Sequence, residues 1–217
     1  NFFGVYLIFN IKQNSSVSKV KELSTKYRSV KLYSLVTIGS QKWMSNNLDV
    51  DHYRNGDPIP HVEDPGEWSR LKSGAWCYYK NDNKNGKRLG KLYNWYAVND
   101  IRGLAPKGFH IPSEDEWTQL SEYLGEKAGF KLKAKNSWIE NGNGNNEIGF
   151  SALSSGYRYA DASRFAYGYT CWWSSTESID IKHAWYRYVG FDIDELGKAY
   201  NYKGYGLSVR CIKDNDE

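Results

Sequence analysis

The segment at residues 112–125 has the sequence PSEDEWTQLSEYLG and gives the clearest local structural signal in the chain. Ser113 can accept a hydrogen bond from the backbone amide of Glu116, and the Glu116 side chain can reach back to the amide of Ser113, which makes a capping box. We expect the helix to stop at Gly125 or Gly129. Large apolar residues at helical spacing predict a buried face made of Trp117, Leu120, Tyr123 and Leu124.

Short strand signals lie on both sides of this helix. Residues 30–38 alternate as a strand and end at Gly39, and two further strands are expected at residues 184–191 and 207–212. Residues 141–146 (NGNGNN) predict a flexible loop. The fold class is therefore α+β, with small twisted antiparallel sheets, one or two helices and long irregular loops.

Composition excludes several classes of protein. The 217 residues can bury a core without metals or disulfide staples, and no apolar run approaches the roughly 18 residues that cross a membrane. The 29 basic and 25 acidic residues are interleaved, so nucleic acid is not an expected partner. Aromatic residues make up 16% of the chain, which argues against disorder for most of it.

The first 35 residues have a different character from the rest. Residues 2–12 predict a strand, residues 13–18 a linker or turn, and residues 17–27 a short amphipathic helix. We therefore divide the chain into an N-terminal extension at 1–35 and a main domain at 36–217. Because the chain starts at Asn1 without a visible signal peptide, a processed or truncated chain is the simplest expectation.

A series of motifs in the main domain resembles one family. This part of the chain is similar to the Fibrobacter succinogenes major paralogous domain family, and the similarity spans about residues 36 to 214. The blocks that carry it occur in the family's order: VTIGSQKWM (36–44), NNL (46–48), GAWCYY (74–79), GKLYNWYAV (90–98), PKGFHIPS (106–113), EW (116–117), GFSAL (149–153), GYR (156–158), WWSST (172–176) and SVRC (208–211).

The resemblance implies a C-type-lectin-like architecture, related in outline to the sulfatase-modifying-factor fold. It also implies an exported bacterial protein of the kind widespread in Bacteroidetes, secreted or displayed on the cell surface and commonly lipid-anchored in the full-length precursor. Two positions depart from the family. Ala105 stands where the family often has a cysteine, which removes the expected disulfide partner of Cys211, and Cys171 occurs where none is expected.

The residues that catalysis would need do not form a recognisable constellation. Cys77, Cys171 and Cys211 lack a CxxC spacing and lack a basic neighbour that clearly lowers their pKa, so they predict buried structural thiols rather than the thiol pair of a sulfatase-modifying-factor-like enzyme. At most one disulfide can form among them. No G-x-S-x-G elbow is present, and His110 is expected to be neutral and bonded to backbone. The acids at 192, 194 and 195 predict a solvated face.

A calcium site has one weak candidate, and no cofactor is expected. Asp82, Asn83 and Asn85 place side-chain oxygens near Gly86, as in half of a calcium loop, but Leu92 occupies the position of the closing glutamate. An Asn-rich turn is the simpler interpretation. The tripeptides with which C-type lectins bind sugars at calcium do not occur.

Tyrosine-rich segments are the best candidates for ligand binding, since tyrosine rings can stack on sugars while polar neighbours bond hydroxyls. The tryptophans at 76, 95, 117, 172 and 173, with Tyr93 and Tyr96, are assigned to the core instead. The candidate binding residues are Tyr157, Arg158, Tyr159, Tyr167, Tyr169, Tyr200, Tyr202 and Tyr205.

Together these features predict an exported, non-enzymatic recognition module that binds a glycan or protein at the bacterial cell surface. The alternative is a structural or adhesive subunit of a surface assembly, in which residues 2–12 pair with the sheet edge of a neighbouring chain. A sulfatase-modifying-factor-like enzyme is a distant third alternative.

Overall fold

A computed structural model describes residues 33–215 of the chain. The described residues belong to the compact unit Tyr33–Glu217. The strand expected at residues 2–12 and the helix expected at 17–27 lie outside the described residues. Within the described part, no helix is long and apolar enough to cross a membrane.

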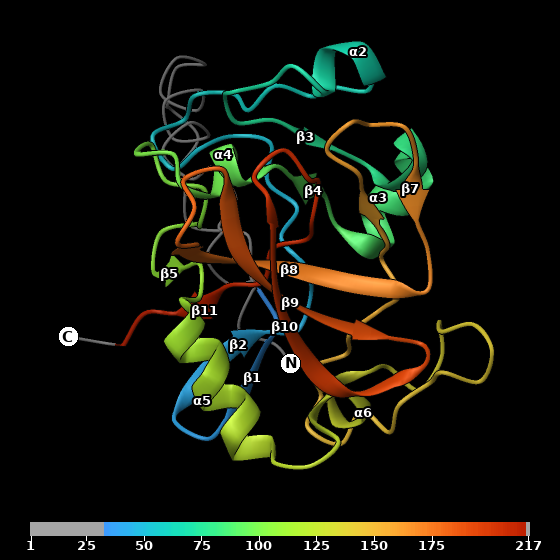
Figure 1. The fold of residues 1–217 in the computed structure, drawn as a ribbon. Coiled ribbons are helices and arrows are strands. Elements are labelled where there is room, and N and C mark those ends of the chain that lie inside the picture. Colours follow the sequence, from blue (N-terminus) through green and yellow to red (C-terminus); the bar gives the residue numbers. More distant parts are fainter. Residues whose placement is uncertain (1–32, 216–217) are drawn as a thin grey trace, which may run out of the picture. The chain divides into compact units, whose positions relative to one another are not determined.

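The strands of residues 33–215 form four antiparallel sheets (Figure 1). The longest strands are β8 (Tyr169–Glu177), β9 (His183–Gly190) and β10 (Ile193–Tyr202), which make a sheet of order β10-β9-β8. A four-stranded sheet has the order β1-β2-β11-β5, from β1 (Leu35–Ile38), β2 (Gln41–Met44), β11 (Ile212–Lys213) and β5 (Phe109–His110). Two small pairs complete the set: β3 (Trp76–Cys77) with β4 (Leu92–Tyr93), and β6 (Tyr157–Arg158) with β7 (Phe165–Ala166).

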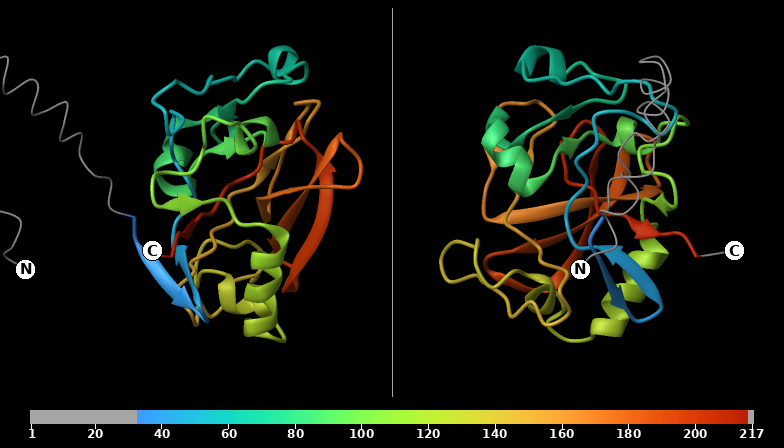
Figure 2. Two further views of the ribbon diagram at one scale, coloured as in Figure 1. Left: turned by 90° about the vertical axis from the view of Figure 1, so that its left-hand side faces the viewer. Right: turned by 180° about the vertical axis from the view of Figure 1, so that it is seen from behind.

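The helices are more numerous than the sequence suggested. The expected helix is α5 (Glu114–Leu124), and the others are shorter: α2 (Pro65–Trp68), the 3₁₀ turn η1 (Tyr79–Asn81), α3 (Asn83–Leu89), α4 (Trp95–Val98) and α6 (Ala128–Leu132). Helices α5 and α6 lie at one end of the unit and α2, α3 and α4 at the other, as both Figure 1 and Figure 2 show. The short helices are one to two turns long, so their sequences carry too few periods to be recognised.

The capping box of α5 is present as expected. The Ser113 hydroxyl accepts from the Glu116 amide at 3.3 Å, and a Glu116 carboxylate oxygen accepts from the Ser113 amide at 2.8 Å. Trp117 is fully buried, with its ring 4.6 Å from that of Trp43 and 5.8 Å from that of Trp172. Tyr123 is 64% exposed, so its assignment to the buried face was wrong.

The predicted tryptophan core is confirmed. The tryptophans at 76, 95, 117, 172 and 173 are all buried, as is Tyr93, while Tyr96 is only half-buried. Their ring nitrogens are mostly satisfied by backbone: Trp95 donates to the Ser174 carbonyl and Trp173 to the Tyr93 carbonyl, both at 2.9 Å. Tryptophan therefore fills the volume and also ties together segments that are distant in the chain.

The loop at residues 141–146 is pinned rather than flexible. The amides of Gly144, Asn145 and Asn146 donate to backbone carbonyls in the segment from Phe130 to Ala134, at 3.1 to 3.2 Å. A Cβ on Gly144 would stand 2.1 Å from the Phe130 carbonyl oxygen. Glycine is needed there because the loop lies directly on the backbone of α6, and this contact is invisible in a local sequence window.

Candidate functional site

An open groove of about 340 Å³, lined mostly by aromatic residues, lies beside the β6–β7 hairpin. We call it the tyrosine groove. It is lined by Tyr157, Tyr159, Arg164, Phe165, Ala166, Tyr167, Tyr169 and Phe191.

A tight hairpin turn positions one side of the groove. The Tyr159 amide donates to the Arg164 carbonyl at 3.2 Å, and the Ala162 amide donates to the Tyr159 carbonyl at 3.0 Å. Asp161 accepts from the amide and the hydroxyl of Ser163, which fixes the tip of the turn. Strand β7 then returns antiparallel to β6 and brings Phe165 opposite Arg158.

Close backbone approach shapes the floor. Gly168 has a φ of +76°, and a Cβ there would stand 2.8 Å from the Phe191 ring. A side chain at this position would push Phe191 out of the groove. Glycine therefore allows Tyr167 and Tyr169 to flank a ring contributed by the β9–β10 turn, with Tyr169 and Phe191 in edge contact at 5.9 Å.

Three tyrosine rings stand together at the other wall. The rings of Tyr157 and Tyr159 are 5.3 Å apart, and Tyr205 packs behind both at 6.1 and 5.5 Å. The Arg164 guanidinium lies 4.6 Å from the centre of the Tyr159 ring. No hydrogen bond or ion pair to another side chain of residues 33–215 engages this guanidinium, so its donors remain available to a ligand.

The phenol groups of Tyr157 and Tyr169 are neutral donors at ordinary pH. Burial raises the pKa of Tyr157, whose hydroxyl donates to the Tyr159 hydroxyl at 3.4 Å. Burial also raises the pKa of Tyr169, whose hydroxyl donates to Asp192 at 3.2 Å. The groove thus combines flat ring surface with hydroxyl groups and one cation.

The structure brings together four of the eight predicted binding residues: Tyr157, Tyr159, Tyr167 and Tyr169. Tyr205 supports two of them from behind. Sequence reasoning missed Arg164 and Phe191. Arg164 was missed because the search followed the tyrosines alone. Phe191 was missed because only the pairing of β8 with β9 brings it to the groove.

The expectation that Arg158 belongs to an exposed binding loop is wrong. Its side chain is almost fully buried, and its guanidinium donates to the carbonyls of Val62 and Glu63 at 2.8 and 2.7 Å. It also lies 4.5 Å from the Trp68 ring. In a strand, neighbouring side chains point to opposite faces, so the residue between two groove tyrosines points into the core.

Tyr200 and Tyr202 are exposed, but they lie on β10 and not in the groove. The Tyr200 ring meets Trp185 at 5.4 Å, and the Tyr202 ring meets His183 at 4.3 Å. Tyr202 lines a separate cleft. The predicted binding residues therefore belong to two surfaces.

The segment that was the weak calcium candidate, Asp82 to Asn85, begins the helix α3 and is not an isolated turn. Asp82 caps α3 by accepting from the Lys84 amide at 2.9 Å, and the Asn85 amide group donates to the Tyr79 carbonyl at 3.0 Å. Asn83 is the first residue of α3. The Asn-rich segment is thus explained by capping, and within residues 33–215 no group of three or more His, Cys, Asp or Glu side chains could hold a metal ion.

The three cysteines are free and buried. Burial raises the pKa of the Cys77 and Cys211 thiols to about 12 and raises that of Cys171 as well. Thiols in this state are poor nucleophiles, which agrees with their assignment as structural residues.

His110 differs from its expected neutral state. Its Nε2 lies 2.7 Å from Glu116 and its Nδ1 lies 2.7 Å from Asp214. These hydrogen bonds, above all the one to Glu116, raise the pKa of His110 to about 9, so the ring is cationic at neutral pH. The expectation failed because it left out both Glu116, six residues further along the chain, and Asp214, which folding brings here from 104 residues away.

Comparison with known proteins adds one finding. The model of the Fibrobacter succinogenes major domain matches residues 36–213. The chain belongs to this family. No curated protein and no solved structure matches it.

The blocks that carry the family resemblance build the frame of this Fibrobacter succinogenes major domain. The side-chain oxygen of Asn47 accepts from the Trp172 ring nitrogen at 2.9 Å and from the Arg210 guanidinium at 2.7 Å. Arg210 also lies 4.2 Å from the Phe150 ring. Four separate blocks thus meet at one buried point, whereas much of the groove lies outside these blocks.

Proposed function

We propose that this domain is a non-enzymatic recognition module of an exported protein, and that its tyrosine groove binds a glycan at the bacterial cell surface. The observation that carries the proposal is the groove itself, with rings from Tyr157, Tyr159, Tyr167 and Tyr169 beside the exposed Arg164 guanidinium, which lies over the Tyr159 ring. Ring faces suit the apolar face of a sugar, and hydroxyls and guanidinium suit its oxygens. The arrangement of small sheets, short helices and long loops also supports a C-type-lectin-like relationship.

Arg164 narrows the class of glycan. An accessible guanidinium held against a ring is suited to pair with a carboxylate or sulfate group by two parallel hydrogen bonds. We therefore propose an acidic oligosaccharide, such as one that contains uronic acid, as the preferred ligand. The buried thiols, with their raised pKa values, favour a binding role over thiol catalysis.

A glycan array with the full chain tests this function, followed by titration calorimetry on the bound sugars. Tyr159→Ala and Tyr167→Ala should abolish or weaken binding, whereas Tyr123→Ala, an exposed tyrosine on α5, should leave it unchanged. The proposal fails if no glycan binds, or if Tyr123→Ala is as damaging as the groove changes.

A further inference from the structure

Two turns of the domain share one sequence pattern and one geometry. Residues 100–102 read Asp-Ile-Arg, and residues 180–182 read Asp-Ile-Lys. In the first turn, Asp100 accepts from the Arg102 amide through its side chain at 3.0 Å and from the Gly103 amide through its carbonyl at 2.9 Å. In the second, Asp180 accepts in the same way from Lys182 at 2.8 Å and from His183 at 2.9 Å.

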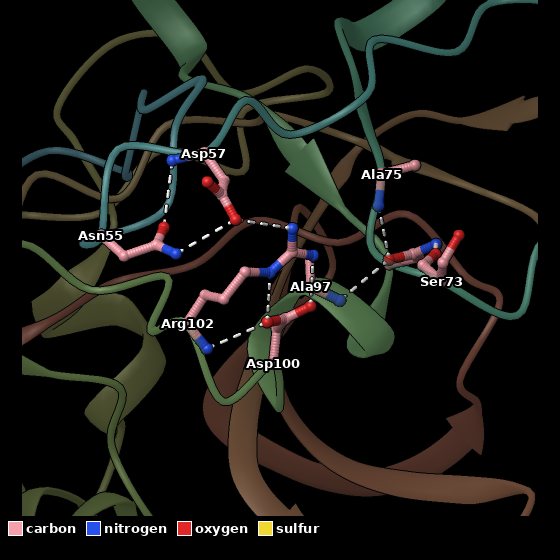
Figure 3. A network of polar contacts seen from close by, with 8 residues as sticks. Asn55, Asp57, Ser73, Ala75, Ala97, Asp100 and Arg102 are labelled. Carbon is pink, nitrogen blue, oxygen red and sulfur yellow. Dashed lines mark hydrogen bonds and ion pairs between the residues drawn. The ribbon is translucent and has the colours of Figure 1, made fainter.

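Each turn has a solvent-exposed isoleucine at its middle position. Ile101 is fully exposed and Ile181 is 77% exposed, and Ile179, two residues earlier, is fully exposed as well. The first turn is fixed further by Arg102, whose guanidinium lies between the carboxylates of Asp100 and Asp57 at 2.8 and 3.3 Å (Figure 3). Large apolar side chains on rigid, exposed turns do not contribute to the core, and their grouping on one surface indicates an interaction site.

Two adjoining clefts connect the isoleucines. The Ile101 cleft measures about 370 Å³ and the Ile181 cleft about 490 Å³, and both are lined by Lys72, Tyr96 and Lys203. Tyr202 lines the second cleft. The concave shape between the turns favours the insertion of a partner's side chain over contact with a flat surface.

The charged side chains around the two clefts indicate which kind of partner would bind there. Lys203 is paired with Glu177, and Asp100 is paired with Arg102. The ammonium groups of Lys72 and Lys182 have no ion pair within residues 33–215, so the clefts carry excess positive charge. An apolar floor beside unpaired lysines is complementary to an apolar side chain flanked by carboxylates.

We propose that this surface, which we call the two-isoleucine face, binds a protein segment in which an apolar or aromatic anchor is flanked by Asp or Glu. The anchor enters the cleft between Ile181 and Tyr202, and the acidic flanks pair with Lys72 and Lys182. The face is separate from the tyrosine groove, since none of the residues that line the two clefts lines the groove. This binding role does not depend on glycan recognition.

A random peptide library displayed on phage and selected against the full chain tests the proposal. The expected result is enrichment of peptides with acidic residues around an apolar anchor. Fluorescence anisotropy of a selected peptide should show affinity reduced by about tenfold or more in Ile101→Ser and Ile181→Ser. Lys72→Glu should weaken binding too, and added salt should weaken it in the unmodified protein.

Tyr167→Ala is the matched control, because it changes an exposed aromatic residue in the groove and should leave peptide affinity unchanged. The isoleucine variants should keep the thermal midpoint of the unmodified chain, since both side chains lie in solvent. The proposal is overturned if no peptide family is enriched, or if the isoleucine variants bind selected peptides as before. Binding to phosphatidylglycerol vesicles that the same variants lose, without peptide binding, would assign the face to a lipid surface instead.

Discussion

The Nε2 atom of His110 lies 2.7 Å from a carboxylate oxygen of Glu116, the residue that closes the capping box of α5. The other ring nitrogen bonds Asp214, which follows β11. One imidazolium therefore joins the start of the main helix to the C-terminal strand of the four-stranded sheet. The Glu116 carboxylate ties the ring only to α5, and the Asp214 carboxylate ties it only to the segment after β11, so both contacts are needed to link the two.

This arrangement predicts a loss of stability at alkaline pH. Because folding raises the pKa of His110 to about 9, the contribution of the charged ring is complete below its unfolded pKa of roughly 6.5 and disappears as pH rises through about 9. Since the ring is partly exposed, we expect about 1 kcal/mol. Urea unfolding of the unmodified chain and His110→Gln, between about pH 6 and pH 10, should show a difference that shrinks with pH.

His52→Gln is the control for this measurement, because His52 is an exposed histidine in a different loop. A constant difference between His110→Gln and the unmodified chain across this pH range would contradict the prediction. At acid pH, Glu116 has the opposite effect on stability, which should fall as pH is lowered. Its hydrogen bonds to His110 and Ser113 outweigh its burial and lower its pKa, so its contribution is lost as pH falls through the lowered value.

The two faces of α5 should respond very differently to truncation. Trp117 packs on Trp43 and Trp172 and is fully buried, so Trp117→Ala should lower the free energy of unfolding by about 3 to 5 kcal/mol. Tyr123→Ala, six positions later, should cost less than about 1 kcal/mol because its ring lies mostly in solvent. Equal losses in chemical denaturation would refute the assignment of the helix faces.

All three thiols should be inaccessible in the folded protein and free after unfolding. Cys77, Cys171 and Cys211 are buried and unpaired, with raised pKa values. Alkylation of the native chain should therefore add no label, and alkylation in denaturant without reductant should add three, as read by mass spectrometry. A mass that shows two protected sulfurs after unfolding would reveal a disulfide and reopen a role for a thiol pair.

Local sequence predicted those features that depend on neighbouring residues. The capping box of α5, the buried Trp117 and the strand at β9 follow from spacing within one turn or one strand. The errors concern contacts made across the chain. The charge of His110 depends on Asp214, which is remote in sequence, as well as on the nearby Glu116. The loop at 141–146 donates to carbonyls of residues 130–134, and those partners are set only by folding.

The sequence predicts only part of the lining of the groove, because the other lining residues depend on contacts made across the chain. Alternating tyrosines predict Tyr157, Tyr159, Tyr167 and Tyr169 as binding residues, and the structure places all four along one groove beside the β6–β7 hairpin. Arg158 was included wrongly, because the pattern does not say which face of β6 looks inward. Phe191 is missed because it follows β9 directly and reaches the groove only through the pairing of β9 with β8.

Substitutions in the groove and in the core should differ in their effects on binding and on stability. Arg164 is exposed and lies on Tyr159, so Arg164→Gln should keep the fold and weaken binding of acidic oligosaccharides more than that of neutral ones. Tyr167→Ala should weaken both by about 2 kcal/mol, as removal of an aromatic hot spot does. Tyr93→Ala should instead unfold the domain, because Tyr93 is fully buried and its hydroxyl bonds the Val50 backbone. Calorimetric titration and thermal melting of the three variants measure these effects. If Arg164→Gln weakens the binding of acidic and neutral sugars equally, the guanidinium only supports the Tyr159 ring and does not pair with an acidic group of the ligand.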